Sequence, residues 1–243
     1  MRLFWLLLLC AGMAAPSVAD THPDPLELLE RMDTLYQQDA SEAVMTMHIV
    51  TPNYERTLKM EAWALGHDYA LVRVLEPLRE RGVSTLKRGN DMWNYLPRIN
   101  RTVRVPPSML MDSWMGSDFT NDDLMRDTSW VDHYDVTMTS DDDHHVLTLT
   151  PLEDTVTVWG QMVITVRQSD LLPVTHEYFN EQGTLMRVME FDDVREFDGI
   201  SLPSRLTLRP TNIEGQRTTV HYESLSFNVD LSESFFTLQN LRR

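Results

Sequence analysis

The chain has 243 residues, of which 42% are hydrophobic and 24% charged, a balance typical of a folded rather than a disordered protein. Its 21 lysines and arginines are outnumbered by 37 aspartates and glutamates, which gives a formal net charge of −16. Nucleic acid and anionic membrane surfaces would repel so acidic a chain, and we therefore exclude nucleic-acid binding.

The N-terminus has the pattern of a secretory signal peptide. Arg2 supplies a positive charge, residues 3–13 form an uncharged apolar run, and small residues stand at the −3 and −1 positions of a cleavage site after Ala19. The run is shorter than the roughly 20 residues that span a bilayer, which argues against a membrane anchor. We expect residues 1–19 to be the signal peptide and residues 20–243 to be one mature domain.

The chain's single cysteine, Cys10, lies inside this apolar run. A lipoprotein signal is an alternative, but a lipobox requires a small residue before the cysteine, and Leu9 stands there. Once the peptide is removed, the mature chain has no cysteine, so it forms no disulfide and uses no thiolate chemistry.

Three segments have helical features. The first begins at a capping Asp24 followed by Pro25 and apolar residues at helical spacing. The second covers Pro107 to Trp114. The third is C-terminal, where Ser232 can cap and the apolar residues are Phe235, Phe236, Leu238 and Leu241.

Nearly all the rest alternates between apolar and polar residues with a period of two, which predicts about eleven strands separated by turn residues. No helical crossovers separate the strands, which argues against a parallel α/β sheet, and one large, curved antiparallel sheet fits best. The expected strands are 43–49, 58–64, 69–75, 134–139, 146–150, 155–159, 162–167, 174–180, 185–191, 204–209 and 218–225.

Several of these strands carry apolar residues on both faces, as where Trp63 stands between Ala62 and Ala64. Helices over one face would explain this, and so would an apolar cavity. The chain also has 15 methionines, which suit a surface that accepts variable apolar partners or form an ordinary core.

Residues 76–124 form the most distinctive stretch. They contain Trp-x-Tyr-x-Pro at 93–97, Arg-x-x-Arg spacing, Met-Gly-Ser-Asp-Phe at 115–119 and Asp-Leu at 123–124, in this order with short gaps. This resembles the outer-membrane lipoprotein-sorting family, the LolA-like superfamily of periplasmic carriers, in its divergent branch with these motifs. The likeness extends over essentially the whole mature chain.

The resemblance implies a mainly β fold with a few helices: a single, incompletely closed antiparallel barrel with helices across its mouth and an apolar cavity between. It also implies a periplasmic, non-catalytic carrier that binds acyl chains of a lipoprotein or lipid without a cofactor. A monomer that exchanges cargo with an inner-membrane exporter of the RND type is expected. An accessory subunit of such an exporter, with a cavity filled by bulky residues such as Trp63 and Trp93, is the alternative.

Basic and aromatic residues of this stretch are candidate ligand contacts. Arg98, Arg101 and Arg104 can bind a phosphate, a headgroup or a carboxylate at the cavity rim; as an alternative, Arg101 and Arg104 can pair with nearby acidic residues. The acidic residues in question are Asp118, Asp122 and Asp123. Trp93 and Tyr95 lie on one face of a strand that Pro97 ends, where they line the cavity or form ordinary core. Trp114, Met115 and Phe119 are expected to belong to the lid or to plug the cavity, and Trp63 is a further candidate at the cavity.

Two local patterns suggest other chemistry. Gly116 permits a tight turn, after which Ser117 or Asp118 can cap a helix; as an alternative, Ser117 is the nucleophile of a lipid esterase. No histidine stands at a known hydrolase spacing from it, and the sequence is not G-x-S-x-G. The acidic and histidine run at 141–145 has neither an EF-hand nor a zinc spacing, so we expect a hairpin tip and no metal.

Overall fold

The computed structural model of the chain describes residues 23–125 and 130–243. The expected signal peptide lies outside the described residues. Within them, no helix is both long enough and apolar enough to cross a bilayer.

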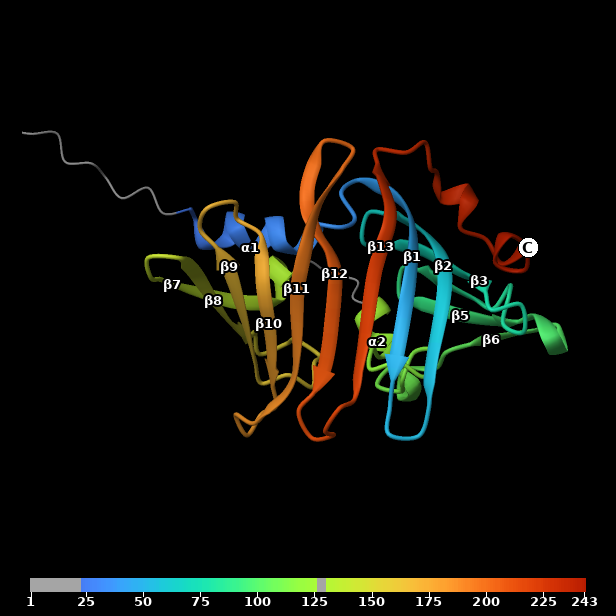
Figure 1. The fold of residues 1–243 in the computed structure, drawn as a ribbon, viewed down its shortest axis with the longest axis horizontal. Coiled ribbons are helices and arrows are strands. Elements are labelled where there is room, and N and C mark those ends of the chain that lie inside the picture. Colours follow the sequence, from blue (N-terminus) through green and yellow to red (C-terminus); the bar gives the residue numbers. More distant parts are fainter. Residues whose placement is uncertain (1–22, 126–129) are drawn as a thin grey trace, which may run out of the picture.

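One antiparallel sheet of thirteen strands forms the body of the described chain, in the order β6-β5-β4-β3-β2-β1-β13-β12-β11-β10-β9-β8-β7. Two meanders, β1 to β6 and β7 to β13, join where β1 pairs with β13. The sheet curls so that its two edges lie behind the central strands (Figure 1). The strands are β1 (Ala40–Val50), β2 (Glu55–Leu65), β3 (Tyr69–Glu76), β4 (Ser84–Arg88), β5 (Asp91–Leu96), β6 (Arg101–Arg104), β7 (Tyr134–Ser140), β8 (His144–Pro151), β9 (Gln161–Arg167), β10 (Pro173–Phe179), β11 (Leu185–Phe197), β12 (Ile200–Pro210) and β13 (Arg217–Phe227).

The expected antiparallel sheet is confirmed, but the number of strands is corrected. The short strands β4, β5 and β6 were not counted among the eleven, because each has too few residues for a clear alternation; only the Trp93–Tyr95 pair indicated β5. The expected strand at 155–159 is instead a loop before β9. Its alternate valines do not face a core: Val156 is fully exposed and Val158 is 43% exposed.

The first helix, α1 (Pro25–Thr34), begins as predicted. The Asp24 carboxylate accepts hydrogen bonds from the backbone N–H groups of Leu26 and Glu27 at 2.8 and 3.2 Å, which satisfies donors that a helix start leaves unpaired. The buried face of α1, which includes Leu29, packs against inward residues of β8 and β9. This half of the concave face is therefore covered.

The connection from β6 to β7 covers the other half. It contains the 3₁₀ turn η2 (Pro107–Met109) and the short helices α2 (Asn121–Met125) and α3 (Trp130–His133). Helix α2 lies behind the central strands, inside the curve of the sheet (Figure 1). The expected helix over 107–114 is thus only one 3₁₀ turn.

The C-terminal segment covers the outer face of β3 to β5. It consists of the 3₁₀ turn η3 (Glu233–Phe235) and helix α4 (Leu238–Leu241), and it buries Phe236 completely against Leu71 and Leu86. Thr237 caps α4 through a bond from the Asn240 N–H, whereas the Ser232 side chain makes no capping bond. Strands β2 and β3 are apolar on both faces because the C-terminal segment covers one face and a cavity opens on the other.

Candidate ligand-binding cavity

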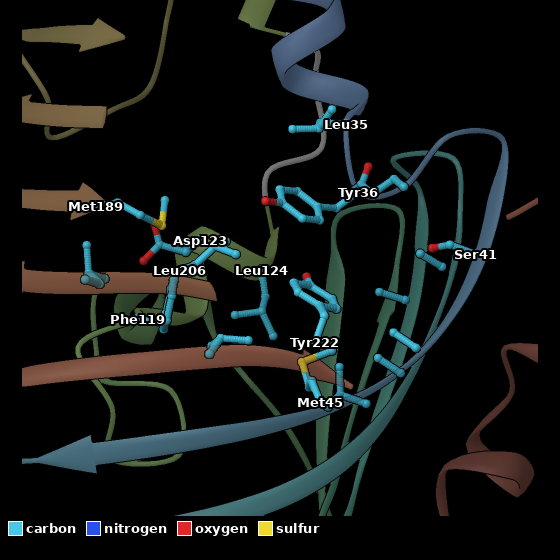
Figure 2. A pocket seen from close by; sticks show the side chains of 18 of the residues that line it. Leu35, Tyr36, Ser41, Met45, Phe119, Asp123, Leu124, Met189, Leu206 and Tyr222 are labelled. Carbon is cyan, nitrogen blue, oxygen red and sulfur yellow. The ribbon is translucent and has the colours of Figure 1, made fainter. Parts of the chain in front are cut away.

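A cavity of about 370 Å³ opens on the concave side of the sheet. This volume lies within the range of pockets that bind small molecules. Side chains from the central strands, from the end of α1 and from the β6–β7 connection surround it (Figure 2). Its apolar wall includes Met45, Met60, Met189, Phe191, Leu206 and Val220.

Small side chains on neighbouring strands create the hollow. Ala62 of β2 pairs with Ala43 of β1 and with Val72 of β3, and Ala64 pairs with Ala70. All five residues line the cavity. Larger residues in this row would fill the space to the density of a normal core, so the cavity is a direct consequence of alanine at inward positions.

Two tyrosines stack on each other in the wall of the cavity. The rings of Tyr36, just after α1, and Tyr222, on β13, stack with centroids 5.1 Å apart (Figure 2). The Tyr36 hydroxyl donates to the carbonyl oxygen of Pro203 at 2.8 Å. Burial raises the pKa of Tyr222 to about 12 and also raises that of Tyr36, so both hydroxyls stay uncharged at neutral pH.

A buried ion pair stands on the cavity wall. Both terminal nitrogens of Arg187, on β11, donate to the carboxylate of Asp123 on α2, at 2.6 and 2.8 Å. The guanidinium also lies over the rings of Trp159 and Tyr178, at 4.5 and 4.3 Å from their centroids. Burial disfavours its charge, but the Asp123 carboxylate outweighs that effect and raises the pKa of Arg187. The cavity therefore holds a permanent cation.

The same Asp123 carboxylate caps its own helix. It accepts a bond from the Thr120 N–H at 2.8 Å, while the Thr120 hydroxyl accepts one from the Asp123 N–H at 3.2 Å. This reciprocal pattern is a capping box. Thr120 is thus the cap of α2, and the expectation that Ser117 or Asp118 fills this role is wrong.

The Met-Gly-Ser-Asp-Phe run instead fastens the β6–β7 connection to the sheet. Gly116 has φ +73°, and a Cβ there would lie 3.0 Å from the Tyr54 hydroxyl, which donates to the Gly116 carbonyl oxygen. The Asp118 carboxylate accepts bonds from Gln216 and Thr218, at 2.6 and 2.7 Å. Glycine is required here by both the turn and the close approach.

Three of the candidate ligand contacts border the cavity: Trp63, Trp114 and Phe119. The Trp63 ring nevertheless packs against Phe235 on the outer face, at 5.4 Å between centroids. Met115 lies beside the core next to the cavity but does not line it. Trp93 and Tyr95 do share one face of β5, as expected, but this is the outer face beneath α4.

The three candidate arginines lie away from the cavity. Arg98, Arg101 and Arg104 are all exposed, on η1 (Pro97–Ile99) and β6. Arg104 pairs with Asp91. Its expected pairing with the acidic residues of the motif is wrong, because Asp123 pairs with Arg187 and Asp118 with residues at the start of β13.

The arrangement that an esterase needs is not present around Ser117 in the described chain. The buried Ser117 hydroxyl donates to the Trp114 carbonyl oxygen at 2.7 Å, and no described histidine hydrogen bonds to it. At 141–145, Asp141 accepts bonds from the N–H groups of Asp143 and His144, which lower the pKa of its carboxyl group. Among the described residues, no cluster of three potential metal ligands occurs.

The sequence reasoning missed Arg187 as a cavity residue, although a signal was available. Arg187, Met189 and Phe191 occupy alternate, inward positions of β11, so a charged side chain stands in an apolar row. Such a residue is normally paired or functional. Its partner could not be read from the pattern, because Asp123 is 64 residues away.

An open antiparallel sheet curled around an apolar cavity, with helices on the concave side, defines a LolA-like fold. A family model described as an uncharacterized protein matches residues 66–243, and the chain belongs to that family. No curated protein matches the chain.

Solved structures of other proteins share this fold over nearly their whole length. A DUF1329 family protein from Desulfovibrio piger is 25% identical, with a TM-score of 0.78, covering 90% of this chain and 100% of that one. A domain described as an outer membrane lipoprotein-sorting protein, from Vibrio parahaemolyticus, is 20% identical with a TM-score of 0.76, covering 90% and 98%. A LolA superfamily protein from Nitrosomonas europaea is 22% identical with a TM-score of 0.72, covering 90% and 99%.

Proposed function

We propose that this protein is a periplasmic carrier that binds the acyl chain of a lipid or lipoprotein in its cavity and moves it between membrane partners without catalysis. The apolar cavity is the observation that carries the proposal. An acyl chain gains about 0.8 kcal/mol for each CH₂ group that it buries. A chain in transit between membranes therefore needs a hollow of this kind.

The place and direction of transport belong to the same proposal. The signal-peptide pattern supports export to the periplasm. The Vibrio parahaemolyticus domain of the same fold is described as lipoprotein-sorting. An inner-membrane exporter is the donor or acceptor that we propose, with the carrier acting as a monomer.

The cavity favours a carrier over an accessory subunit with a filled interior. Two tryptophans were the residues expected to fill it. Trp93 lies on the outer face, and the Trp63 ring packs against Phe235. About 370 Å³ consequently remains between the sheet and the helices.

Two measurements test whether the protein binds and carries lipid. Protein expressed without added ligand is extracted and analysed for lipid by mass spectrometry, and the stripped protein is titrated with a fluorescent fatty acid. We expect co-purified lipid and saturable binding. Absence of both would overturn the proposal.

A cavity-filling variant tests whether the ligand binds in the cavity. Ala62→Phe puts a ring into the row of small inward residues and should abolish binding of the fluorescent fatty acid. Thr57→Phe places the same ring on the exposed outer face of the same strand and should leave binding unchanged. Equal effects of the two variants, in protein whose circular dichroism is native, would show that the ligand binds elsewhere.

A further inference from the structure

Arg187 is an unusual residue for the wall of an apolar cavity. It is 6% exposed, and among the described residues it is the only arginine or lysine that lines the space. The formal anions on the same wall are Asp123 and Asp33, and the Asp33 carboxylate accepts a bond from the Trp130 N–H at 3.0 Å. A buried cation stabilises little by itself, because its desolvation offsets the attraction of its partner.

The Arg187 guanidinium can hydrogen bond to an anionic ligand. A guanidinium has five N–H donors in a planar fork, and the bonds to Asp123 engage its two terminal nitrogens. Its Nε is buried and has no hydrogen-bond partner in the part of the chain that the structure describes. The Trp159 and Tyr178 rings both contact the guanidinium and help to hold it in place, so the fork is pre-organised for a planar carboxylate or a phosphate.

We propose that Arg187 binds the oxyanion headgroup of a single-chain acyl ligand, a carboxylate or a phosphate monoester, in exchange for the Asp123 carboxylate. This inference rests on the proposed carrier function, because the acyl chain occupies the apolar part of the cavity. The exchange keeps one anion on the guanidinium throughout. The ligand therefore replaces an existing ion pair and does not need to introduce a new buried charge.

The exchange also couples ligand binding to the position of α2. The Asp123–Arg187 pair joins α2 to β11, and Figure 2 shows Asp123 among the side chains around the hollow, with Met189 of β11 nearby. A displaced Asp123 carboxylate must leave the apolar wall for solvent, since an unpaired buried charge is costly. Release of this pair removes a bond between α2 and β11 and thereby favours movement of α2 away from β11.

Competition among ligands of equal chain length tests the headgroup site. A long-chain fatty acid, the matching alkyl phosphate and the matching primary alcohol each displace the fluorescent fatty acid from stripped protein at neutral pH. We expect both acids to bind about tenfold more tightly than the alcohol. Inorganic phosphate at the same concentration should displace nothing, because it has no chain; displacement by it would show a free-anion site and overturn the lipid assignment.

Variants then assign the preference to Arg187. Asp123→Asn removes the competing charge but keeps an acceptor for Thr120, so the acids should bind more tightly and the alcohol equally well. The double variant Asp123→Asn/Arg187→Met avoids an unpaired buried carboxylate, and in it the acids should bind no better than the alcohol. As the matched control, Glu190→Gln/Arg209→Met removes an exposed ion pair between the same strand β11 and β12 and should keep the preference.

The outcomes separate the two proposals. If none of the chain-bearing ligands binds the wild-type protein, carriage itself fails. If acid and alcohol bind equally, or if the preference survives in the folded double variant, the Arg187 site is overturned while carriage stands. Thermal melting of each variant establishes that it is folded.

Discussion

Tyr36 and Tyr222 stack almost in parallel, with an angle of 11° between their rings, and thereby join the end of α1 to strand β13 beside the cavity. The two residues are far apart in the chain and meet only because β13 pairs with β1 at the centre of the sheet. Burial raises the pKa of both hydroxyls, that of Tyr222 to about 12.

This shift predicts a loss of stability at high pH. In the unfolded chain a tyrosine loses its proton near pH 10, whereas folded Tyr222 keeps it up to about pH 12. The folded state thus binds more protons in this window, and its stability falls as the pH rises from 10 to 12, by at most about 2–3 kcal/mol for this group. Urea unfolding at several pH values should show a smaller loss for Tyr222→Phe than for wild type. Parallel curves for the two proteins would contradict the prediction.

The hydrogen bond from Trp114 Nε1 to the Thr85 hydroxyl, 3.0 Å long, holds the β6–β7 connection on the sheet. Thr85→Val keeps the shape but leaves the buried indole N–H without an acceptor, and should cost about 1–3 kcal/mol of unfolding free energy. Thr85→Ser keeps the hydroxyl and should cost clearly less. The prediction fails if both variants lower the urea midpoint equally.

Phe236 attaches the C-terminal segment to the outer face of the sheet. Its side chain is completely buried, so Phe236→Ala should destabilise the protein by about 3–5 kcal/mol. Leu238→Ala, at a position 39% exposed in the same segment, should change stability by about 0.5 kcal/mol or less. Neither residue lines the cavity, and fatty-acid binding by the folded fraction of each variant should therefore equal that of wild type.

Gly160 packs directly against the backbone of the β10–β11 turn. A Cβ at this position would lie 2.6 Å from the Asn180 carbonyl oxygen and 2.7 Å from the Glu181 Cα. Gly160→Ala forces these backbones apart and should cost about 1–3 kcal/mol, measured by thermal or urea unfolding. Gln161→Ala, one residue further on, is the control and should be nearly neutral; a Gly160 variant as stable as this control would show that the turn can shift freely.

Local patterns predicted the elements whose signals lie within a few residues. The Asp24–Pro25 start of α1 and the two-residue alternation of strands such as β1 and β8 depend on neighbours in the chain, and the structure contains them. The pattern failed at 155–159, where alternating valines face solvent. Alternation shows that a strand has two faces, but only pairing and packing decide whether either is buried.

The sequence by itself determined an acidic, antiparallel sheet protein and showed that Trp93 and Tyr95 share one face of a strand. Only the tertiary structure decided that this face is the outer one, beneath α4, because alternation does not tell which side of a sheet becomes concave. It also decided that Asp123 and Arg187, 64 residues apart, form one buried pair. The curl of the sheet and the path of the β6–β7 connection bring them together, and neither is encoded in a local period.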